Sequence, residues 1–253
     1  MKSALVTGAS GGIGLAITRL LADEGVKLTL VARNEARLKE IIASLPGDGH
    51  QCMRADLSIP ADIDQLADHI SENHYDLLIN NAGIGIYGRF EELDLERQTR
   101  MLTLNINALV ALSHAYLKGA KSGDTLVNIA SVLGFSSLPG ASAYAGTKGF
   151  VLRFSESLWY EFKDRGVYVL AFCPGITASN FHQASGGDEG DYPKIMIQTP
   201  EQVAIEAVAA LKKRSGPIAV PGAINRLILF SSRFMSRKQN VNIMGGFSPI
   251  KQG

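Results

Sequence analysis

The sequence predicts a doubly wound α/β fold, in which helices cover both faces of a parallel sheet of about seven strands. Apolar runs of strand length alternate with segments of helical periodicity almost to the end of the 253-residue chain. These runs are continuous rather than alternating, which is typical of parallel strands buried on both faces. Because 46% of the residues are hydrophobic, one continuous core can form, and we expect a single domain over residues 1–253.

The first half of the chain supplies four of the expected strands, as apolar runs at residues 4–6, 28–31, 51–54 and 76–79. Between them, residues 13–23 place Ile13, Ile17 and Leu21 at helical spacing, and residues 35–44 form a second helix. Ser58 is expected to cap a third helix that ends near residue 72, because serine hydroxyls accept hydrogen bonds from the first helical turn.

The second half continues the alternation, with strands at residues 125–129, 167–172 and 218–220 and helices at residues 94–118, 142–164 and 200–213. Two stretches depart from it. Residues 176–197 are rich in glycine and acidic residues, and we expect a mobile loop there that can act as a lid. Residues 222–253 form a C-terminal extension, with an amphipathic helix expected at 223–238 and a loosely ordered segment at 241–253.

Charge and composition exclude several classes of partner. The 25 basic and 24 acidic residues give a net charge of +1, so we expect no nucleic acid as a partner. The five histidines show no spacing typical of metal ligands, and no metal is expected. Cys52 and Cys173 lie in apolar runs and are expected to be free, buried thiols. Because the first strand begins at residue 4, there is no room for a targeting signal, and a cytoplasmic location is expected.

A glycine-rich motif, Thr7-Gly8-Ala9-Ser10-Gly11-Gly12-Ile13-Gly14, follows the first strand and opens a helix. Glycines at such a turn let the backbone approach a pyrophosphate closely, and the N–H groups at the start of the helix can bind phosphate. An ordinary strand-to-helix turn is the alternative, but the position in the first β-α unit favours a dinucleotide.

Ser131, Tyr144 and Lys148 form the strongest candidate for a catalytic group. Tyr144 and Lys148 lie four residues apart on one helix, and their side chains therefore share a face. An ammonium about 4 Å from the phenol would lower the tyrosine pKa by roughly three units. Ser131 ends the fifth strand and can donate a hydrogen bond to a substrate oxygen. An incidental pair of residues on a long helix is the alternative.

Further motifs follow the expected strands in order. Asn80-Asn81-Ala82-Gly83 comes after the fourth strand, Asn105 lies in a long helix, and Pro174-Gly175 comes after the sixth strand. With the glycine motif, Ser131 and the Tyr-x-x-x-Lys pattern at 144–148, this set resembles the compact, single-domain branch of the short-chain dehydrogenase/reductase family over about residues 3–221. The resemblance implies a Rossmann-type fold and hydride transfer between NAD(P)(H) and a carbonyl or alcohol carbon.

The resemblance also implies the catalytic roles. Ser131 would orient the carbonyl, Tyr144 would give or take the proton, and Lys148 would bind the nicotinamide ribose and lower the tyrosine pKa. Asn105 would hold a water in the proton relay, although a polar residue that caps or kinks the long helix is an alternative for it. A non-catalytic regulator that senses NADP(H) on the same fold is the alternative to the enzyme, but such proteins usually lack the tyrosine or the lysine.

The residues expected to bind the cofactor lie at the carboxyl ends of the strands. The motifs and the resemblance together give Gly8, Ser10, Gly12, Ile13, Gly14, Arg33, Asp56, Leu57, Asn81, Ala82, Gly83, Tyr144, Lys148, Pro174, Gly175, Ile176 and Thr177. Asp56 and Leu57 would lie beside the adenine ring, with a simple turn as the alternative for Asp56. The backbone of Ile176 would face the carboxamide.

NADP(H) is the expected cofactor, with NAD(H) left open. Residues 31–34 contain no carboxylate to accept from a ribose 2′-hydroxyl, whereas Arg33 can pair with a 2′-phosphate. A solvated arginine at the start of a helix is the alternative, though a cation is slightly unfavourable there. No basic residue lies in the glycine motif itself.

The expected substrate is a small-molecule carbonyl compound or alcohol of apolar character. Apolar residues that follow strand ends suggest its pocket, although such residues often just cover the core; they are Ile84, Ile86, Tyr87, Phe135, Leu138 and Phe181. The resemblance implies a homodimer or homotetramer paired through the two long helices. For the extension we expect packing on the cleft or on a partner subunit. Contact with a membrane ranks last, because an amphipathic helix most often buries its apolar face in protein.

Overall fold

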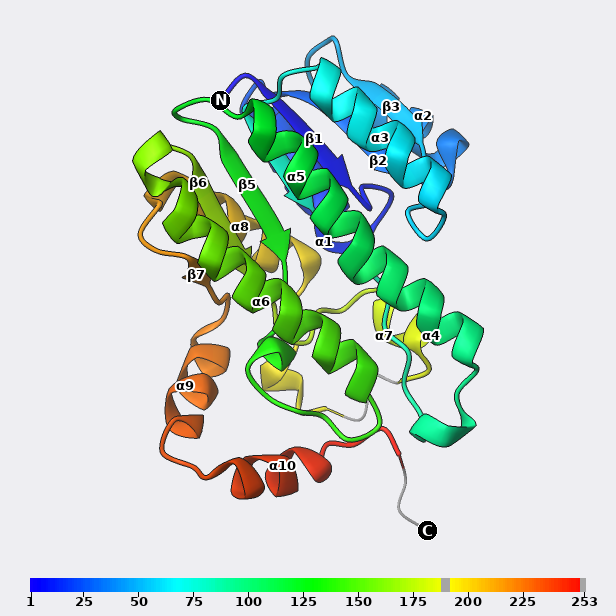
Figure 1. Cartoon of the computed structure of the whole chain (residues 1–253), viewed down its shortest axis with the longest axis vertical. Helices are drawn as coiled ribbons and strands as arrows, with labels where there is room; N and C mark the ends of the chain where they lie inside the picture. Colours follow the sequence, from blue (N-terminus) through cyan, green and yellow to red (C-terminus); the bar gives the residue numbers. More distant parts are fainter. Residues whose placement is uncertain (188–191, 251–253) are drawn as a thin grey trace.

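The computed structural model describes residues 1–187 and 192–250 (Figure 1). Its strands are β1 (Ser3–Thr7), β2 (Lys27–Ala32), β3 (Gln51–Arg54), β4 (Leu77–Asn80), β5 (Thr125–Ile129), β6 (Tyr168–Phe172) and β7 (Ile218–Ala219). Its α-helices are α1 (Gly12–Asp23), α2 (Glu35–Ser44), α3 (Pro60–Glu72), α4 (Leu95–Leu102), α5 (Leu109–Gly119), α6 (Ser142–Phe162), α7 (Asn180–Ser185), α8 (Pro200–Lys213), α9 (Ala223–Ser232) and α10 (Arg237–Gly245).

The seven strands form one parallel sheet in the order β3-β2-β1-β4-β5-β6-β7, which confirms the predicted doubly wound fold. The strand order reverses between β1 and β4. In sheets of this kind, ligands bind beyond the carboxyl ends of the strands at that point of reversal. The glycine-rich loop follows β1 and the loop at Asn81 follows β4, so the two predicted cofactor loops meet there.

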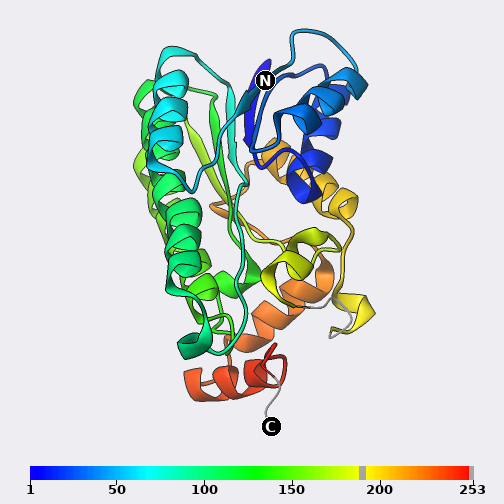
Figure 2. The same ribbon diagram turned by 90° about the vertical axis from the view of Figure 1, so that its right-hand side faces the viewer.

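Helices cover both faces of the sheet (Figure 2). Because side chains alternate along a strand, Val6 of β1 belongs to the core on one face and its neighbour Leu5 to the core on the other. The first core includes residues of α1, α2 and α8, and the second includes residues of α3, α5 and α6. Both faces are therefore apolar, which explains the continuous apolar runs of the strands.

Polar caps begin several helices where the sequence places them. The Asn34 side chain accepts a hydrogen bond from the backbone of Arg37 at the start of α2, and Thr199 and Gln202 form a capping box at α8. The prediction that Ser58 caps α3 is wrong. Ile59 occupies that position before Pro60, and the Ser58 hydroxyl donates instead to the Asp56 carboxylate at 2.7 Å.

The long helix predicted at residues 94–118 contains an irregular turn that the sequence pattern does not reveal. A π-helical segment, Thr103–Ala108, joins α4 to α5 and includes Asn105. Such segments insert an extra residue into a helical turn and are frequent at functional sites. The side chain of Asn105 is turned into the protein, where it is almost fully buried.

The C-terminal extension differs from its prediction. Residues 223–238 form one full helix, α9, and only the start of a second, because Ser236 and Gln239 form a capping box that begins α10. The expectation of a loosely ordered segment at 241–253 is also wrong for residues 241–245, which belong to α10, and residues 251–253 lie outside the described structure. The two helices lie at the end of the molecule remote from the N-terminus (Figures 1 and 2).

Two other predictions concern single residues and a loop. Both cysteines are free; Cys173 is buried as predicted, whereas Cys52 is half-buried. In the predicted lid, α7 and a 3₁₀ turn, Lys194–Met196, flank the acidic centre, and residues 188–191 lie outside the described structure. Among the described residues, no helix is long and apolar enough to cross a membrane.

Candidate active site

Ser131, Tyr144 and Lys148 come together beyond the carboxyl end of β5. Ser131 lies two residues after the end of β5, and Tyr144 and Lys148 lie in the first two turns of α6. The Ser131 hydroxyl accepts from the backbone N–H of Leu133 at 3.1 Å, and its side chain is near enough to Tyr144 to lower the phenol pKa. The Lys148 ammonium donates to the backbone carbonyl of Ile129 at 2.7 Å and lies 5.8 Å from the centroid of the Tyr144 ring. All three predicted residues are buried.

Burial governs the acid-base properties of this group. It raises the pKa of Tyr144 above its usual value, while the Ser131 side chain acts in the opposite direction. In the chain alone the predicted lowering of this pKa is not seen, and the Lys148 ammonium donates to the Ile129 carbonyl. Burial also lowers the pKa of Lys148, to about 8.

Asn105 joins the π-helical segment to the loop after β4. Its amide oxygen accepts from the backbone N–H of Ile84 at 3.0 Å, and its amide nitrogen donates to the Ile84 carbonyl at 2.9 Å. A Cβ added to Gly83 would lie 3.3 Å from the Asn105 oxygen and 3.6 Å from the Lys148 nitrogen. Asn105 and Lys148 therefore both border Gly83, and the bonds of Asn105 to Ile84 also anchor the irregular turn.

Aromatic and aliphatic side chains enclose one side of Tyr144. The rings of Tyr87 and Phe181 have centroids 6.0 and 5.6 Å from that of Tyr144. Of the six apolar residues predicted for the pocket, Phe135 alone belongs elsewhere, in a cluster with Leu109 and Val151. Sequence analysis missed Met244 of α10, which packs on the cluster around Tyr144.

The glycine-rich loop packs tightly against the loop after β4. The Asn81 amide donates to the carbonyls of Thr7 and Gly8 at 2.9 and 3.2 Å. A Cβ on Gly14 would run into the Asn81 amide and the Gly8 carbonyl, whereas a Cβ on Gly11 would meet nothing within 4 Å. Gly8 also has a positive φ of 66°, which favours glycine. The loop is thus closed on the Asn81 side and open at Gly11.

The part of the candidate cofactor site predicted to bind adenine contains the Arg33 cation and a turn at Asp56. Arg33 follows β2 and is exposed, and its charge is among the influences that lower the pKa of Asp56 against the opposing effect of burial. The Asp56 carboxylate accepts from the backbone and hydroxyl of Ser58, as in a simple turn. Leu57 is buried in the core, so it can offer a ligand only its backbone.

The loop after β6 is supported by the extension. The Pro174 carbonyl accepts from the backbone of Val132 at 2.9 Å, which joins this loop to the one that carries Ser131. A Cβ on Gly175 would lie 2.7 Å from the amide oxygen of Asn225, the buried residue of α9. Sequence analysis missed Asn225, because a lone asparagine in an amphipathic helix carries no signal of a buried partner.

A dinucleotide fits the residues present. The helix α1 has no side-chain cap at Gly11, and the space beyond that residue is open, so its first N–H groups can bind a phosphate. The Lys148 ammonium is buried with one backbone carbonyl as its hydrogen-bond partner, although it carries three donors. The hydroxyl groups of a ribose would supply the missing acceptors.

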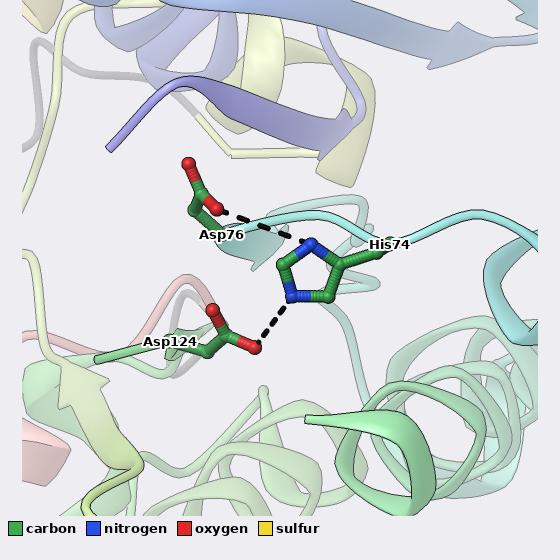
Figure 3. Close-up of side chains that lie close together, drawn as sticks. All are labelled: His74, Asp76 and Asp124. Atoms are coloured by element: carbon green, nitrogen blue, oxygen red, sulfur yellow. Dashed lines mark hydrogen bonds and ion pairs between the residues drawn. The ribbon is translucent and has the colours of Figure 1, made fainter. Parts of the chain in front are cut away.

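A second polar cluster lies at the amino ends of β4 and β5, just before these two strands begin (Figure 3). His74 lies 2.9 Å from the Asp124 carboxylate and 4.0 Å from that of Asp76. Asp124 also accepts from the backbone of Lys121 at 2.7 Å, and Asp76 accepts from the backbone of Ser3 at 3.1 Å. The three residues have ligand types that could hold a cation, but their hydrogen bonds already tie neighbouring turns together.

Comparison with known proteins places this chain in a family. Residues 2–190 match the model of the short chain dehydrogenase family. An uncharacterized oxidoreductase of Staphylococcus epidermidis is 31% identical over 212 residues, which cover 82% of this chain and 90% of that protein.

Solved structures agree with that match. A short-chain dehydrogenase from Sphingobium yanoikuyae in complex with NADPH has a TM-score of 0.82 and 32% identity, covering 92% of this chain and 94% of that one. A bulky-bulky ketone specific alcohol dehydrogenase from Comamonas testosteroni has a TM-score of 0.76 and 27% identity, covering 92% of each chain. The protein is therefore an oxidoreductase that belongs to the short chain dehydrogenase family.

Proposed function

We propose that this enzyme reduces bulky, apolar ketones or aldehydes with NADPH, in a reaction that is reversible in principle. The observation that carries the proposal is the buried group of Ser131, Tyr144 and Lys148, with an aromatic cluster on one side of Tyr144. The Tyr144 phenol carries a proton at neutral pH, and the positive charge of Lys148 would favour transfer of that proton to a carbonyl oxygen in the complex with cofactor.

Each residue has a distinct part in the proposed reaction. Ser131 hydrogen-bonds the substrate oxygen and so polarises the carbonyl, and Tyr144 delivers the proton to that oxygen. Lys148 binds the nicotinamide ribose and provides positive charge near the phenol as it loses its proton. Asn105 holds Gly83 and Ile84 in place beside Lys148 and would hold a water of the proton relay. NADPH, when bound, supplies the hydride.

The preference for NADPH rests on charge. Arg33 lies exposed after β2, residues 31–34 contain no carboxylate to accept from a 2′-hydroxyl, and an arginine can bind a 2′-phosphate through two hydrogen bonds. The solved relative from Sphingobium yanoikuyae contains NADPH, which supports this preference. The other cofactor contacts would come from the glycine-rich loop and from residues 81–83 and 174–177.

Bulky, apolar substrates are favoured by the side chains around Tyr144. Tyr87 and Phe181 come from the loop after β4 and from α7, and Met244 comes from the extension. The relative that is specific for bulky-bulky ketones supports the same class of substrate. In the proposed cycle, residues 176–187 and 192–197 cover this cluster as a lid, and the backbone hydrogen bond from Tyr87 to Ser185 of α7 supports that position.

A homodimer or homotetramer is also proposed, with the two long helical segments at the contact. Phe150 and Phe154 of α6 stack with ring centroids 5.6 Å apart, and Phe150 is exposed. A stacked aromatic pair at the surface is a suitable centre for an interface. Light scattering at micromolar concentration should give a mass of two or four chains; a monomer would contradict this proposal.

A steady-state assay tests the proposed reaction. With NADPH and a panel of bulky ketones, the wild-type protein should oxidise the cofactor, and Tyr144→Phe should lower kcat by about 10²–10⁴-fold. The Kd for NADPH should change by less than about threefold, because the phenol hydroxyl is not needed to bind the dinucleotide. Undiminished turnover in Tyr144→Phe would refute the assignment of the proton donor.

A further inference from the structure

The C-terminal extension exposes the apolar face that a helix normally buries. In α9 the residue turned inward and buried is Asn225, whereas Leu227 and Phe230 are 64% and 57% exposed. Phe234, one turn farther on, is 78% exposed and contacts the Phe230 ring edge-on, with centroids 5.5 Å apart. Because Leu227, Phe230 and Phe234 follow at i, i+3 and i+7, they form one apolar stripe on the outer side of the helix.

The second helix of the extension continues this surface. Val241 and Ile243 of α10 are exposed, while Met244 is turned inward to the cluster around Tyr144. The 3₁₀ turn that contacts α9 adds Ile195, which is 75% exposed. The extension was expected to pack on the cleft or on a partner subunit. Met244 does pack on the cluster around Tyr144, whereas Leu227, Phe230 and Phe234 stay exposed in the single chain. An exposed apolar surface of this kind marks an interaction site.

The charge of the extension indicates what covers this surface. Residues 222–253 contain five basic residues and no acidic ones, which leaves 20 basic and 24 acidic residues, a net charge of −4, in residues 1–221. Arg226 pairs with Glu206 at 2.9 Å. Within residues 1–187 and 192–250, Arg233, Arg237 and Lys238 form no ion pair. The apolar stripe is therefore accompanied by unpaired positive charge.

We propose that α9 and α10 dock this enzyme on the surface of a lipid bilayer that carries anionic headgroups. Exposed aromatic and aliphatic side chains with flanking Arg and Lys are the features by which helices lie in a membrane interface. The apolar side chains enter the acyl boundary and the cations contact the headgroups. The protein lies on the membrane without crossing it, because no described helix could span one.

Vesicle flotation of the full chain tests the proposal. Vesicles of phosphatidylcholine alone are compared with vesicles that contain an equal part of phosphatidylglycerol, at low and high salt. The wild-type protein should bind the anionic vesicles at least about tenfold more than the neutral ones, and salt should weaken that binding. Absence of flotation with anionic vesicles at low salt, or equal binding to both kinds, would overturn the proposal.

Two variants and a matched control locate the contact. Phe230→Ser with Phe234→Ser, and separately Arg233→Glu with Arg237→Glu, should each reduce binding at least about tenfold. Ile59→Ser with Phe90→Ser removes two similarly exposed apolar residues outside the extension and should leave binding unchanged. An unchanged Kd for NADPH shows that each variant is folded. Equal loss in the control, or a wild-type oligomer that Phe230→Ser with Phe234→Ser dissociates without any vesicle binding, would overturn the proposal.

Discussion

Lys148 is an unusual residue, because its ammonium is buried with a backbone carbonyl, that of Ile129, as its hydrogen-bond partner. Burial of a cation without a carboxylate disfavours its charged form, which is why the pKa falls to about 8. The burial that destabilises the charged ammonium also fits the proposed function, because it leaves N–H donors that can bind the ribose hydroxyl groups of the cofactor. The same destabilisation should be visible as a dependence of stability on pH.

The first prediction follows from this pKa. The unfolded chain binds a proton at Lys148 up to about pH 10.5 and the folded chain only up to about 8, so the free energy of unfolding should rise with pH between these values. From pH 7.5 to 9.5 the wild-type protein should gain about 2 kcal/mol relative to Lys148→Met. Urea denaturation of both proteins at the two pH values measures the difference. A constant difference would show that the ammonium is not buried.

The second prediction concerns Arg33. Loss of its hydrogen bonds to a 2′-phosphate should lower kcat/KM for NADPH by about 10- to 100-fold in Arg33→Ala, with little change for NADH. Arg37→Ala is the control, because Arg37 lies one turn farther along and pairs with Glu40. Equal efficiency with both cofactors, unaffected by Arg33→Ala, would contradict the proposed preference.

At this scale the sequence predicts which residues meet but not how they behave. The spacing of Tyr144 and Lys148 places both side chains on one face of α6, as found. The predicted lowering of the Tyr144 pKa is not seen in the chain alone. Residue spacing does not reveal how far the phenol is desolvated, or that the Lys148 ammonium donates to the Ile129 carbonyl. Asn225 lies too far along the chain from Gly175 for any local pattern to connect them.

The glycine-rich loop and the start of α1 form the proposed phosphate-binding element. Two of its glycines, Gly14 and Gly11, have different surroundings. Gly14 has no room for a Cβ, because the Asn81 amide and the Gly8 backbone occupy that space. Gly11 has open space and an extended φ of −174°, which any residue adopts. Packing therefore accounts for Gly14, and for Gly11 we propose that access of the cofactor is the reason.

The third prediction separates these two roles. Gly14→Ala should lower the free energy of unfolding by about 1–3 kcal/mol, because the backbone it meets cannot move aside. Gly11→Ala should change that free energy by less than about 0.5 kcal/mol yet weaken NADPH binding, since its methyl group would occupy the approach of the pyrophosphate. Denaturation curves and cofactor titrations measure the two effects. Full NADPH affinity in Gly11→Ala would place the phosphates elsewhere.

Sequence analysis predicts most elements, and its errors have local causes. The apolar runs predicted all seven strands, and the predicted helices at residues 35–44 and 200–213 begin where α2 and α8 begin. The extension was predicted as one helix because apolar spacing continues through residues 233–236, where Ser236 starts a new cap. The π-helical turn at Asn105 left no trace in the pattern, since an extra residue shifts the apolar period only slightly.

At the scale of the whole molecule, the C-terminal extension packs against the loop before α6 and the cluster around Tyr144, about 100 residues earlier in the sequence. Met244 of α10 packs on the cluster around Tyr144, and the Ser248 hydroxyl donates to the Pro139 carbonyl at 3.0 Å, in the loop before α6. A Cβ on Gly140 would lie 2.8 Å from the Ile250 side chain. The extension therefore closes one side of the candidate substrate site while α9 and part of α10 face outward.

The fourth prediction tests that closure. Met244→Ala should raise KM for a bulky ketone by roughly five- to tenfold, because apolar surface next to the substrate is lost, and should leave the Kd for NADPH unchanged. Ile243→Ala is the matched control, because Ile243 is the residue next to Met244 and its side chain is exposed. Identical KM values for Met244→Ala and the wild-type protein would exclude α10 from the substrate site.

The central claim is transfer of a hydride from NADPH to a carbonyl carbon, with Tyr144 as the proton donor. It is tested most directly with NADPH that carries deuterium at nicotinamide C4 on the transferred side, mixed with a bulky ketone. The wild-type product should contain one deuterium on the alcohol carbon, and Tyr144→Phe should bind the cofactor but form little product. An alcohol product without deuterium, or equal labelled product from Tyr144→Phe, would contradict the account.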